Sequence, residues 1–212
     1  MRLLELFCGT KSIGKVFERN GWDVVSVDII KEFDPTYCQS ILDLDLRIDL
    51  SGKFDVIWAS PPCTTFSIAS VSHHWKNGVP SDDRIIGNAL LAKTLEIINL
   101  KQPKYWFIEN PRGMMRKLPI MKYLPKQTIS YCQYGDSRMK PTDIWTNCDD
   151  WLPKTICKNG DSCHERAPRG AKTGTQGLKG ARDRSVIPEG LVWEIYHAVS
   201  FQLRQKTENS NN

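Results

Sequence analysis

Hydrophobic residues in the first part of the chain gather in short runs separated by longer mixed segments. Four runs are typical of strands: residues 2–7 (RLLELF), 23–28 (DVVSVD), 54–59 (FDVIWA) and 104–110 (KYWFIEN). KVFERN predicts a helix after the first run. Leu91, Leu95 and Ile98 have the spacing of one helix face within residues 84–100. Strands separated by helix-length segments predict an α/β fold, with a mostly parallel sheet and helices on both faces.

This alternation fades near residue 147. Residues 148–185 are rich in Gly, Pro, Cys and basic residues, which predicts a small irregular insert. After the insert, Val192, Ile195 and Val199 share one face of a final helix, and Pro188 suits its first turn. The predicted organisation is a main domain over residues 1–147, the insert over 148–185, a completing helix over 186–204 and a flexible tail over 205–212.

Composition narrows the class of protein. The 212 residues are 40% hydrophobic, enough for one sizeable core, and no apolar run approaches the ~20 residues of a membrane span. The N-terminal apolar stretch is too short for a signal peptide, so we expect a cytoplasmic protein. Seven cysteines, an odd number, argue against a disulfide framework. A net charge of +5 permits a polyanionic partner without requiring one.

Candidate ligand-binding stretches follow all four predicted strands. FCGTKS follows the first, Asp28 ends the second, SPPC follows the third and ENPRG follows the fourth. Parallel α/β sheets bind ligands at the carboxyl ends of their strands, so we expect these stretches along one edge.

The SPPC stretch is built to hold a cysteine rigidly. Each proline fixes its own φ and pushes the preceding residue into an extended conformation, so Cys63 should have one orientation. A thiol held in this way is a candidate nucleophile, although a cysteine packed under a loop is the alternative. Glu109, at the end of an apolar strand, can be kept protonated by desolvation, or can be a simple rim carboxylate.

Taken in order, LELFCGTKSIGKVF, VDI, DVIWASPPCTTFS, FIENPRG and YGDSRMKPTDIWTN resemble the motifs of the cytosine-5 DNA methyltransferases. The resemblance covers most of residues 1–147, with a weaker trace in RSVIPEGLVWEIYHAV. It implies a Rossmann-like methyltransferase fold and methyl transfer from S-adenosylmethionine to C5 of cytosine through a covalent adduct with C6. The implied catalytic residues are Cys63 as nucleophile, Glu109 with Asn110 at the base, and Arg138 as the basic residue that holds the base.

The resemblance also implies a binding site for S-adenosylmethionine. The glycine turn would wrap its amino-acid end through backbone N–H groups. Asp28, nineteen positions after Gly9, would meet the ribose hydroxyls. Asp43 matches the position that binds the adenine amine, although Asp45 is close enough to compete, and solvated turn residues are the alternative for these acids. The expected cofactor-binding residues are Phe7, Cys8, Gly9, Thr10, Asp28, Ile29, Asp43, Leu44, Ser60 and Pro61.

The sequence departs from the family pattern at several places. Thr64 replaces a glutamine after Pro-Cys, Lys11 replaces a glycine of the first motif, and Arg184 replaces an asparagine before SV. The family's sequence-reading domain is also much longer than residues 148–184. The partner is therefore expected to be DNA, most simply double-stranded, read with low or partner-supplied specificity. RNA or a free nucleotide stays an alternative substrate.

The insert offers a possible structural zinc site. Cys148, Cys157, Cys163 and His164 can form a tetrahedral set, and a small polar segment without a core would need such a staple. Cys132 could substitute for one ligand. Simple loop cysteines are the alternative.

Basic and aromatic residues supply candidate nucleic-acid contacts. A glycine-rich cationic loop suits phosphate binding, although a solvated loop is nearly as good an interpretation. In the segment after the nucleophile, His74 or Trp75 could fill the space left by a flipped base, or Trp75 could pack on the core. The expected contacts are Thr64, His74, Trp75, Arg166, Arg169, Lys172, Lys179 and Arg182.

Cytosine-5 methylation of DNA is the function that these patterns favour. An amino-methyltransferase acting on N4 of cytosine or N6 of adenine would keep the fold, since SPP also begins that motif. A degenerate, zinc-containing nucleic-acid-binding protein is the non-enzymatic alternative, which the changes at Thr64, Lys11 and Arg184 motivate.

Overall fold

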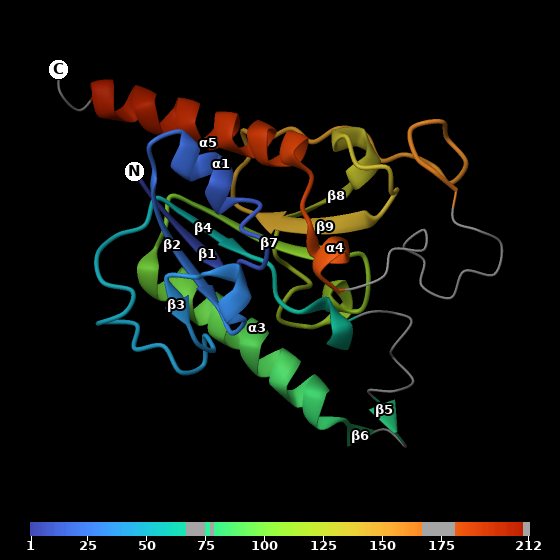
Figure 1. The fold of residues 1–212 in the computed structure, drawn as a ribbon, viewed down its shortest axis with the longest axis horizontal. Helices are drawn as coiled ribbons and strands as arrows, with labels where there is room; N and C mark the ends of the chain where they lie inside the picture. Colours follow the sequence, from blue (N-terminus) through green and yellow to red (C-terminus); the bar gives the residue numbers. More distant parts are fainter. Residues whose placement is uncertain (67–74, 77–78, 167–180, 210–212) are drawn as a thin grey trace.

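The computed structural model describes residues 1–66, 75–76, 79–166 and 181–209 (Figure 1). In this part of the chain, seven strands form one sheet in the order β3-β2-β1-β4-β7-β9-β8, and β5 and β6 form a separate hairpin. The strands are β1 Arg2–Leu6, β2 Asp23–Asp28, β3 Tyr37–Cys38, β4 Val56–Ala59, β5 Trp75–Lys76, β6 Val79–Pro80, β7 Tyr105–Pro111, β8 Lys126–Ser130 and β9 Pro141–Thr146.

Helices lie on both faces of the sheet. The α-helices are α1 Gly14–Arg19, α3 Asp82–Lys101, α4 Ala181–Ser185 and α5 Glu189–Asn209, and the 3₁₀ helices are η1 Lys31–Phe33, η2 Cys63–Thr65, η4 Met115–Lys117 and η5 Tyr131–Tyr134. Figure 1 shows α1 and α5 together on one side of the sheet and α3 on the other. None of these helices combines the length and the apolar character that crossing a membrane requires.

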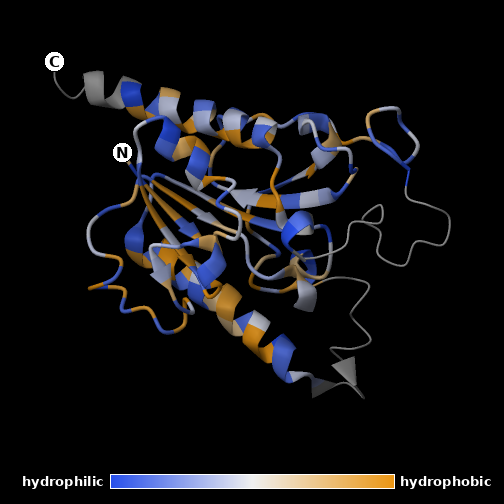
Figure 2. Ribbon diagram, in the orientation of Figure 1, coloured by the Kyte–Doolittle hydropathy of each residue, from blue (hydrophilic) through white to orange (hydrophobic). Residues whose placement is uncertain are grey.

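Two hydrophobic clusters form the core, one on each face of the sheet. Side chains alternate along β1, so Leu3 packs with Phe17 of α1 and Ile195 of α5, while Leu4 packs on the opposite face with Leu91 of α3. Figure 2 shows hydrophobic residues concentrated in the central strands and a mixture of both kinds along α5. Because both faces of the sheet are covered, the side chains on each face are buried, and the strands therefore read as continuous apolar runs.

The pairing confirms a mostly parallel sheet. β3, β2, β1, β4 and β7 are parallel neighbours, whereas β9 is antiparallel to both β7 and β8. The four predicted strands and the predicted helices are present, and Val192, Ile195 and Val199 are all buried. The C-terminal helix continues to Asn209, beyond residue 204 where we expected it to end.

Candidate active site

The register of the parallel strands aligns four candidate residues along one edge. Leu6 pairs with both Val27 and Ala59, and Ala59 pairs with Ile108. The residues that follow this aligned row are Phe7, Asp28, Ser60 and Glu109. The four predicted stretches therefore begin side by side at the carboxyl edge of the sheet, where α/β folds bind their ligands.

The segment that carries Cys63 is held from two directions. The Asn110 side-chain amide donates to the Pro61 carbonyl over 2.8 Å, which joins the SPPC and ENPRG stretches directly. The buried guanidinium of Arg84, from the first turn of α3, donates to the Thr65 carbonyl over 2.7 Å. Cys63 itself is exposed at the start of η2. The nucleophile candidate is thus a surface thiol on an anchored backbone.

Gly113 lets the ENPRG turn approach the end of this segment. The Met114 N–H donates to the Phe66 carbonyl over 2.7 Å. A Cβ on Gly113 would lie 2.4 Å from the Phe66 carbonyl oxygen, so a side chain there would force the two backbones apart. The glycine of ENPRG therefore has a packing reason that the sequence did not reveal.

Glu109 is buried beside a tyrosine. Its side chain is 6% exposed, and the fully buried Tyr131 hydroxyl donates to Oε1 over 2.9 Å. Burial, followed by the nearby Glu109 carboxyl group, raises the pKa of Tyr131 well above its ordinary value. Tyr131 therefore stays a hydrogen-bond donor and fixes the orientation of the Glu109 carboxyl group.

Two basic residues of the SRMK stretch approach the same place. Arg138 is 4% exposed and its Nε donates to Asp136 Oδ1 over 2.8 Å, an ion pair that raises the Arg138 pKa. The Lys140 ammonium lies 4.4 Å from the Tyr131 ring centroid. Burial lowers the Lys140 pKa, while the charges of Glu109 and Cys63 act on it in the opposite direction. Lys140 is a candidate site residue that the sequence analysis missed, although it lies in a motif that we quoted.

A salt bridge to a buried carboxylate supports the end of β7 that carries Glu109 and Asn110. Asn110 pairs across the sheet with Asp143, which is fully buried. Arg116 Nε donates to Asp143 Oδ2 over 2.8 Å, and the Thr128 hydroxyl donates to Oδ1 over 2.8 Å. Both carboxylate oxygens of Asp143 are therefore satisfied, as a buried charge requires.

The first loop adopts a glycine-like conformation at three positions. Phe7, Gly9 and Lys11 have φ values of 58°, 48° and 55°. Lys11, which stands where the family has glycine, thus keeps the left-handed backbone that glycine favours. The Gly9 N–H donates to Asp28 Oδ2 over 2.9 Å, so Asp28 also anchors this loop.

Glu5 is a second residue that the sequence analysis missed. Its carboxyl group is 2% exposed and accepts from the backbone N–H groups of Ile13, over 3.3 Å, and Gly14, over 3.1 Å. It therefore satisfies backbone donors at the start of α1. Desolvation raises the Glu5 pKa to about 8 against the lowering effect of these bonds. Burial also raises the pKa of the Cys8 thiol to about 12, so Cys8 is a packing residue of the loop.

Other predicted cofactor residues differ in exposure. Ile29 is 71% exposed and Asp43 is exposed, whereas Leu44 is buried at 5%. Asp45 accepts from the backbone N–H groups of Arg47 and Ile48, which lowers its pKa. Asp45 is thus engaged in its own turn, and this distinguishes it from Asp43.

The C-terminal segment returns to the first loop. The Ile187 N–H donates to the Ser12 hydroxyl over 3.3 Å, and Arg138 Nη1 donates to the Asp183 carbonyl over 3.3 Å. The segment around α4 therefore connects the first loop and the SRMK stretch.

Three of the four predicted metal ligands lie together in the structure, and the fourth, Cys148, does not. Ligand atoms of Cys132, Cys157, Cys163 and His164 all lie within 4.8 Å of one another. Cys148 does not belong to this group because it is 3% exposed within the hydrophobic core, where desolvation raises its thiol pKa to about 11. Cys132, which we named as a possible substitute, takes its place in the cluster.

Some predicted nucleic-acid contacts fall in the described residues. Thr64 and Arg182 are exposed, the latter with its guanidinium 5.8 Å from the Phe33 ring centroid. Arg166 is exposed and donates to the Gly160 carbonyl over 3.3 Å. The predictions for His74, Arg169, Lys172, Lys179 and the side chain of Trp75 lie outside the described residues.

Comparison with known proteins agrees with this architecture. Residues 1–122 match the family model of C-5 cytosine-specific DNA methylases. The chain is 35% identical over 215 residues to a "Probable DNA (cytosine-5)-methyltransferase" of Frog virus 3, covering 92% of this chain and 98% of the viral one. It is 30% identical to the type II methyltransferase M.FnuDI of Fusobacterium nucleatum over 128 residues, 55% of this chain and 34% of that protein.

Solved structures resemble the fold at low sequence identity. A prophage-encoded DNA modification methyltransferase of E. coli matches with a TM-score of 0.54 and 17% identity, over 74% of this chain and 52% of the other. DNMT2 of Spodoptera frugiperda matches with a TM-score of 0.50 and 19% identity, over 68% and 49%. The chain thus spans about half of these structures.

The sheet, its covering helices and the loops at its carboxyl edge define a Rossmann-like methyltransferase fold. The family match over more than half of the chain makes the identification more specific. The chain belongs to the C-5 cytosine-specific DNA methylase family and is a DNA (cytosine-5)-methyltransferase.

The family implies S-adenosylmethionine as the methyl donor, and the residues at the edge fit it. The first loop turns through three left-handed residues, a conformation that suits backbone N–H contacts to an anionic group. Ile29 offers an exposed apolar surface beside Asp28. The buried Asn110 Oδ1 has no hydrogen-bond partner among the described residues, so this oxygen can accept a hydrogen bond from a ligand at the edge of the sheet.

Proposed function

We propose that the protein methylates C5 of cytosine through a covalent adduct between Cys63 Sγ and C6 of the ring. One observation carries the proposal. The hydrogen bond from Asn110 to Pro61 joins the segment of an exposed thiol to a buried, oriented carboxyl group. A cysteine that only packs within the structure would not need its segment to be bonded to Asn110, the residue beside Glu109.

The reaction requires a nucleophile and an acid at one ring. The Cys63 thiolate adds to C6, and the electrons of the C5–C6 double bond move to C5. Glu109 donates a proton to N3 and so offsets the charge that develops in the ring. Oε1 of Glu109 accepts from Tyr131, and no described donor engages Oε2, which is therefore the oxygen assigned to the base. After methylation, C5 loses its proton to solvent, the C5–C6 double bond re-forms as the C6–S bond breaks, Glu109 takes back the proton from N3 and the thiolate is restored.

Positive charge near the two groups supports this assignment. The charges of Cys63 and Glu109 act on Lys140, and a nearby ammonium is the kind of group that activates a nucleophilic thiol. Arg138 is held by Asp136 and by the Asp183 carbonyl, which fixes its guanidinium before any base arrives. We assign Lys140 to activation of the thiolate and Arg138 to holding the base.

S-adenosylmethionine supplies an electrophilic methyl group when bound. We assign its amino-acid end to the loop Phe7–Gly9–Lys11 and its ribose to Asp28, whose Oδ1 and Oδ2 already orient the backbone at Ile30 and Gly9. We assign its adenine to exposed Ile29, with Asp43 at the exocyclic amine. Leu44 and Cys8 support these residues from the core.

The substrate we propose is double-stranded DNA. A cytosine must leave the base stack before a thiol can reach C6, and the exposed position of Cys63 suits a base presented from outside. Exposed Thr64 and Arg182 lie on segments that flank the site, and we assign them to the flipped base and to phosphate. The short interval over residues 148–184, where the family has its sequence-reading domain, favours low sequence specificity.

Trapping with a fluorinated substrate tests the mechanism. DNA containing 5-fluorocytosine has no C5 proton to lose, so the Cys63 adduct should persist after methyl transfer and survive denaturing electrophoresis. Cys63→Ala should give no adduct, whereas Cys38→Ala, which removes another exposed thiol, should behave as wild type. A stable adduct with Cys63→Ala, or none with wild type while a known cytosine-5 methyltransferase is trapped, would overturn the proposal.

A further inference from the structure

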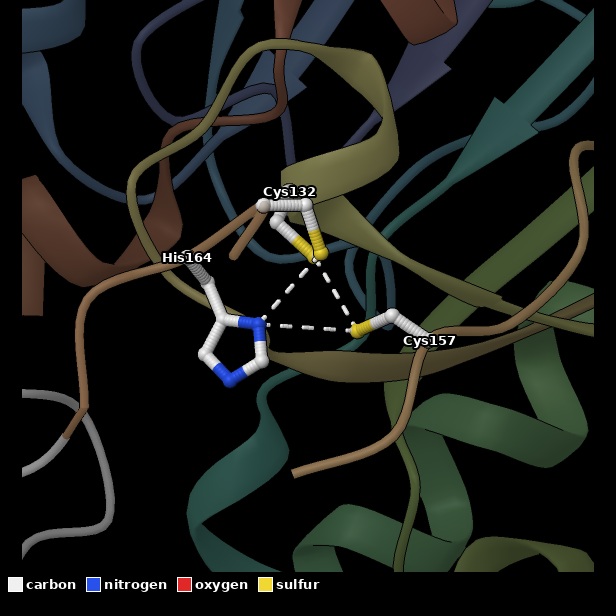
Figure 3. Close-up of side chains that lie close together, drawn as sticks. Cys132, Cys157 and His164 are labelled. Atoms are coloured by element: carbon white, nitrogen blue, oxygen red, sulfur yellow. Dashed lines mark hydrogen bonds between the residues drawn. The ribbon is translucent and has the colours of Figure 1, made fainter. Parts of the chain in front are cut away.

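Four potential metal ligands converge from two separate segments. Cys132 belongs to η5, and Cys157, Cys163 and His164 come from the irregular segment after β9. Figure 3 shows the side chains of Cys132, Cys157 and His164 pointing toward a common centre. Cys132 and Cys157 are buried, Cys163 is exposed and His164 is half-buried, so the cluster lies at the edge of the protein.

The spacing of the ligand atoms matches a tetrahedral metal. Cys132 Sγ lies 3.2 Å from Cys157 Sγ and 3.6 Å from Cys163 Sγ, and His164 Nδ1 lies 3.7 Å and 3.5 Å from the sulfurs of Cys157 and Cys163. Tetrahedral zinc, with Zn–S of about 2.3 Å, puts two sulfurs about 3.8 Å apart and a sulfur and a nitrogen about 3.5 Å apart. A disulfide would require about 2.05 Å.

We propose that Cys132, Cys157, Cys163 and His164 form a structural zinc site. Three thiolates and one imidazole are a closed, four-coordinate set for Zn²⁺, with no position left for a reacting molecule. The Gln133 side-chain amide donates to Cys163 Sγ over 3.3 Å, the kind of contact that orients and stabilises a ligating thiolate. Hard cations such as Mg²⁺ and Ca²⁺ prefer oxygen ligands and do not suit this set.

The segment that carries Cys157 has little regular structure of its own, so a bound zinc would stabilise it. Residues 152–158 contain no helix or strand, and few apolar side chains there are buried. A few hydrogen bonds attach the segment to β8 and η5, among them those from the Cys157 N–H to Ser130 Oγ over 3.2 Å and from the Lys154 N–H to the Tyr134 hydroxyl over 2.9 Å. Further along the chain, the Glu165 N–H donates to the Ser137 carbonyl over 2.9 Å. A metal shared between Cys132 and this segment would supply the stability that a small core does not.

The site also adjoins two candidate catalytic contacts. Cys132 directly follows Tyr131, which orients Glu109, and the bond from Glu165 reaches the residue before Arg138. Zinc would therefore act as a positioning element for Tyr131 and Arg138. This consequence rests on the proposed function, whereas the metal site itself rests on the ligand geometry alone.

Metal content of the full chain tests the site directly. Protein produced with added zinc and dialysed should hold one zinc per chain by inductively coupled plasma mass spectrometry. Cys163→Ser should lower the zinc content at least tenfold and should fold, because Cys163 is exposed. Cys38→Ser, an exposed thiol outside the cluster, should retain full content. Zinc-free wild type, or Cys163→Ser that binds zinc as wild type does, would overturn the proposal.

Cobalt substitution provides a second, independent measurement. Co²⁺ in place of zinc should give the intense visible bands of a tetrahedral site and thiolate charge-transfer absorption, and Cys157→Ser should weaken the latter. An octahedral spectrum would contradict the assigned ligand set. So would full metal binding in Cys163→Ser and Cys157→Ser together with loss of metal in Cys148→Ala. Neither measurement uses DNA or a methyl donor, so a failed trapping experiment and a failed zinc site remain distinguishable.

Discussion

The parallel half of the sheet and the segment from β8 to α4 each supply part of the candidate active site, but different interactions hold them. In the first, strand register places Phe7, Asp28, Ser60 and Glu109 in one row, and backbone pairing does most of the positioning. In the second, side-chain contacts position Tyr131, Arg138 and Lys140. Loss of one side chain should therefore disturb the geometry of the first region less than that of the second, even where it removes a reacting group.

The largest expected effect is on chemistry in the first region. Cys63→Ala should lower methyl transfer by about 10³-fold or more because it removes the nucleophile. The free energy of unfolding should change by less than about 0.5 kcal/mol, since Cys63 is exposed. A radioactive methyl-transfer assay and urea unfolding check both values. Retained activity would remove Cys63 from the mechanism.

Arg116→Ala should produce the largest loss of stability, about 3 kcal/mol. It leaves the fully buried Asp143 carboxylate without its cation. Urea unfolding measures the change, and Arg116→Lys, which keeps a charge, should lose less. A loss below about 1 kcal/mol for Arg116→Ala would show that the pair contributes little to the antiparallel half of the sheet.

Gly113→Ala should separate the two backbones that meet at Phe66. The new Cβ would lie 2.4 Å from a carbonyl oxygen, and overpacking of this kind costs about 1–3 kcal/mol. We expect kcat to fall more than the stability loss explains, because the ENPRG turn moves relative to Cys63. Arg112→Ala, in the same turn, is the control and should leave both quantities close to wild type.

Tyr131→Phe removes one hydroxyl from the second region. Glu109 loses the donor to Oε1, and we expect kcat to fall about tenfold with a stability loss of about 1 kcal/mol. An unchanged kcat with reduced stability would assign Tyr131 to structure alone.

The last prediction concerns Glu5 and the pH dependence of stability. Its folded pKa is raised from 4.5 to about 8, so the folded state binds the proton more tightly than the unfolded state. Stability from this group is therefore complete below pH 4.5 and is lost as the pH rises toward 8, by at most about 1.4 kcal/mol per unit. Urea unfolding of Glu5→Gln across this range should show a shallower decline than wild type. Parallel curves would contradict the assignment.

Much of the fold could be predicted from the sequence, because the four strands follow from local pattern. The carboxyl-edge stretches and the Cys63–Glu109 pair of the candidate site were proposed from the order of motifs. Glu5 and Lys140 were missed because a buried carboxyl group in a strand and a lysine after an arginine give no local signal of their neighbours. Cys148 was misassigned as a ligand because spacing alone does not distinguish a core thiol from a ligating one.

By itself, the sequence determined the alternation of strands and helices, because side-chain periodicity is a local property that each segment carries with it. It also determined that Cys63 leaves a strand stiffly, since two prolines restrict the backbone without help from elsewhere. Only the tertiary structure decided which groups meet, including Tyr131 with Glu109 and Cys132 with Cys157. Those contacts join residues more than twenty positions apart, and their distances are set by how the sheet and loops pack.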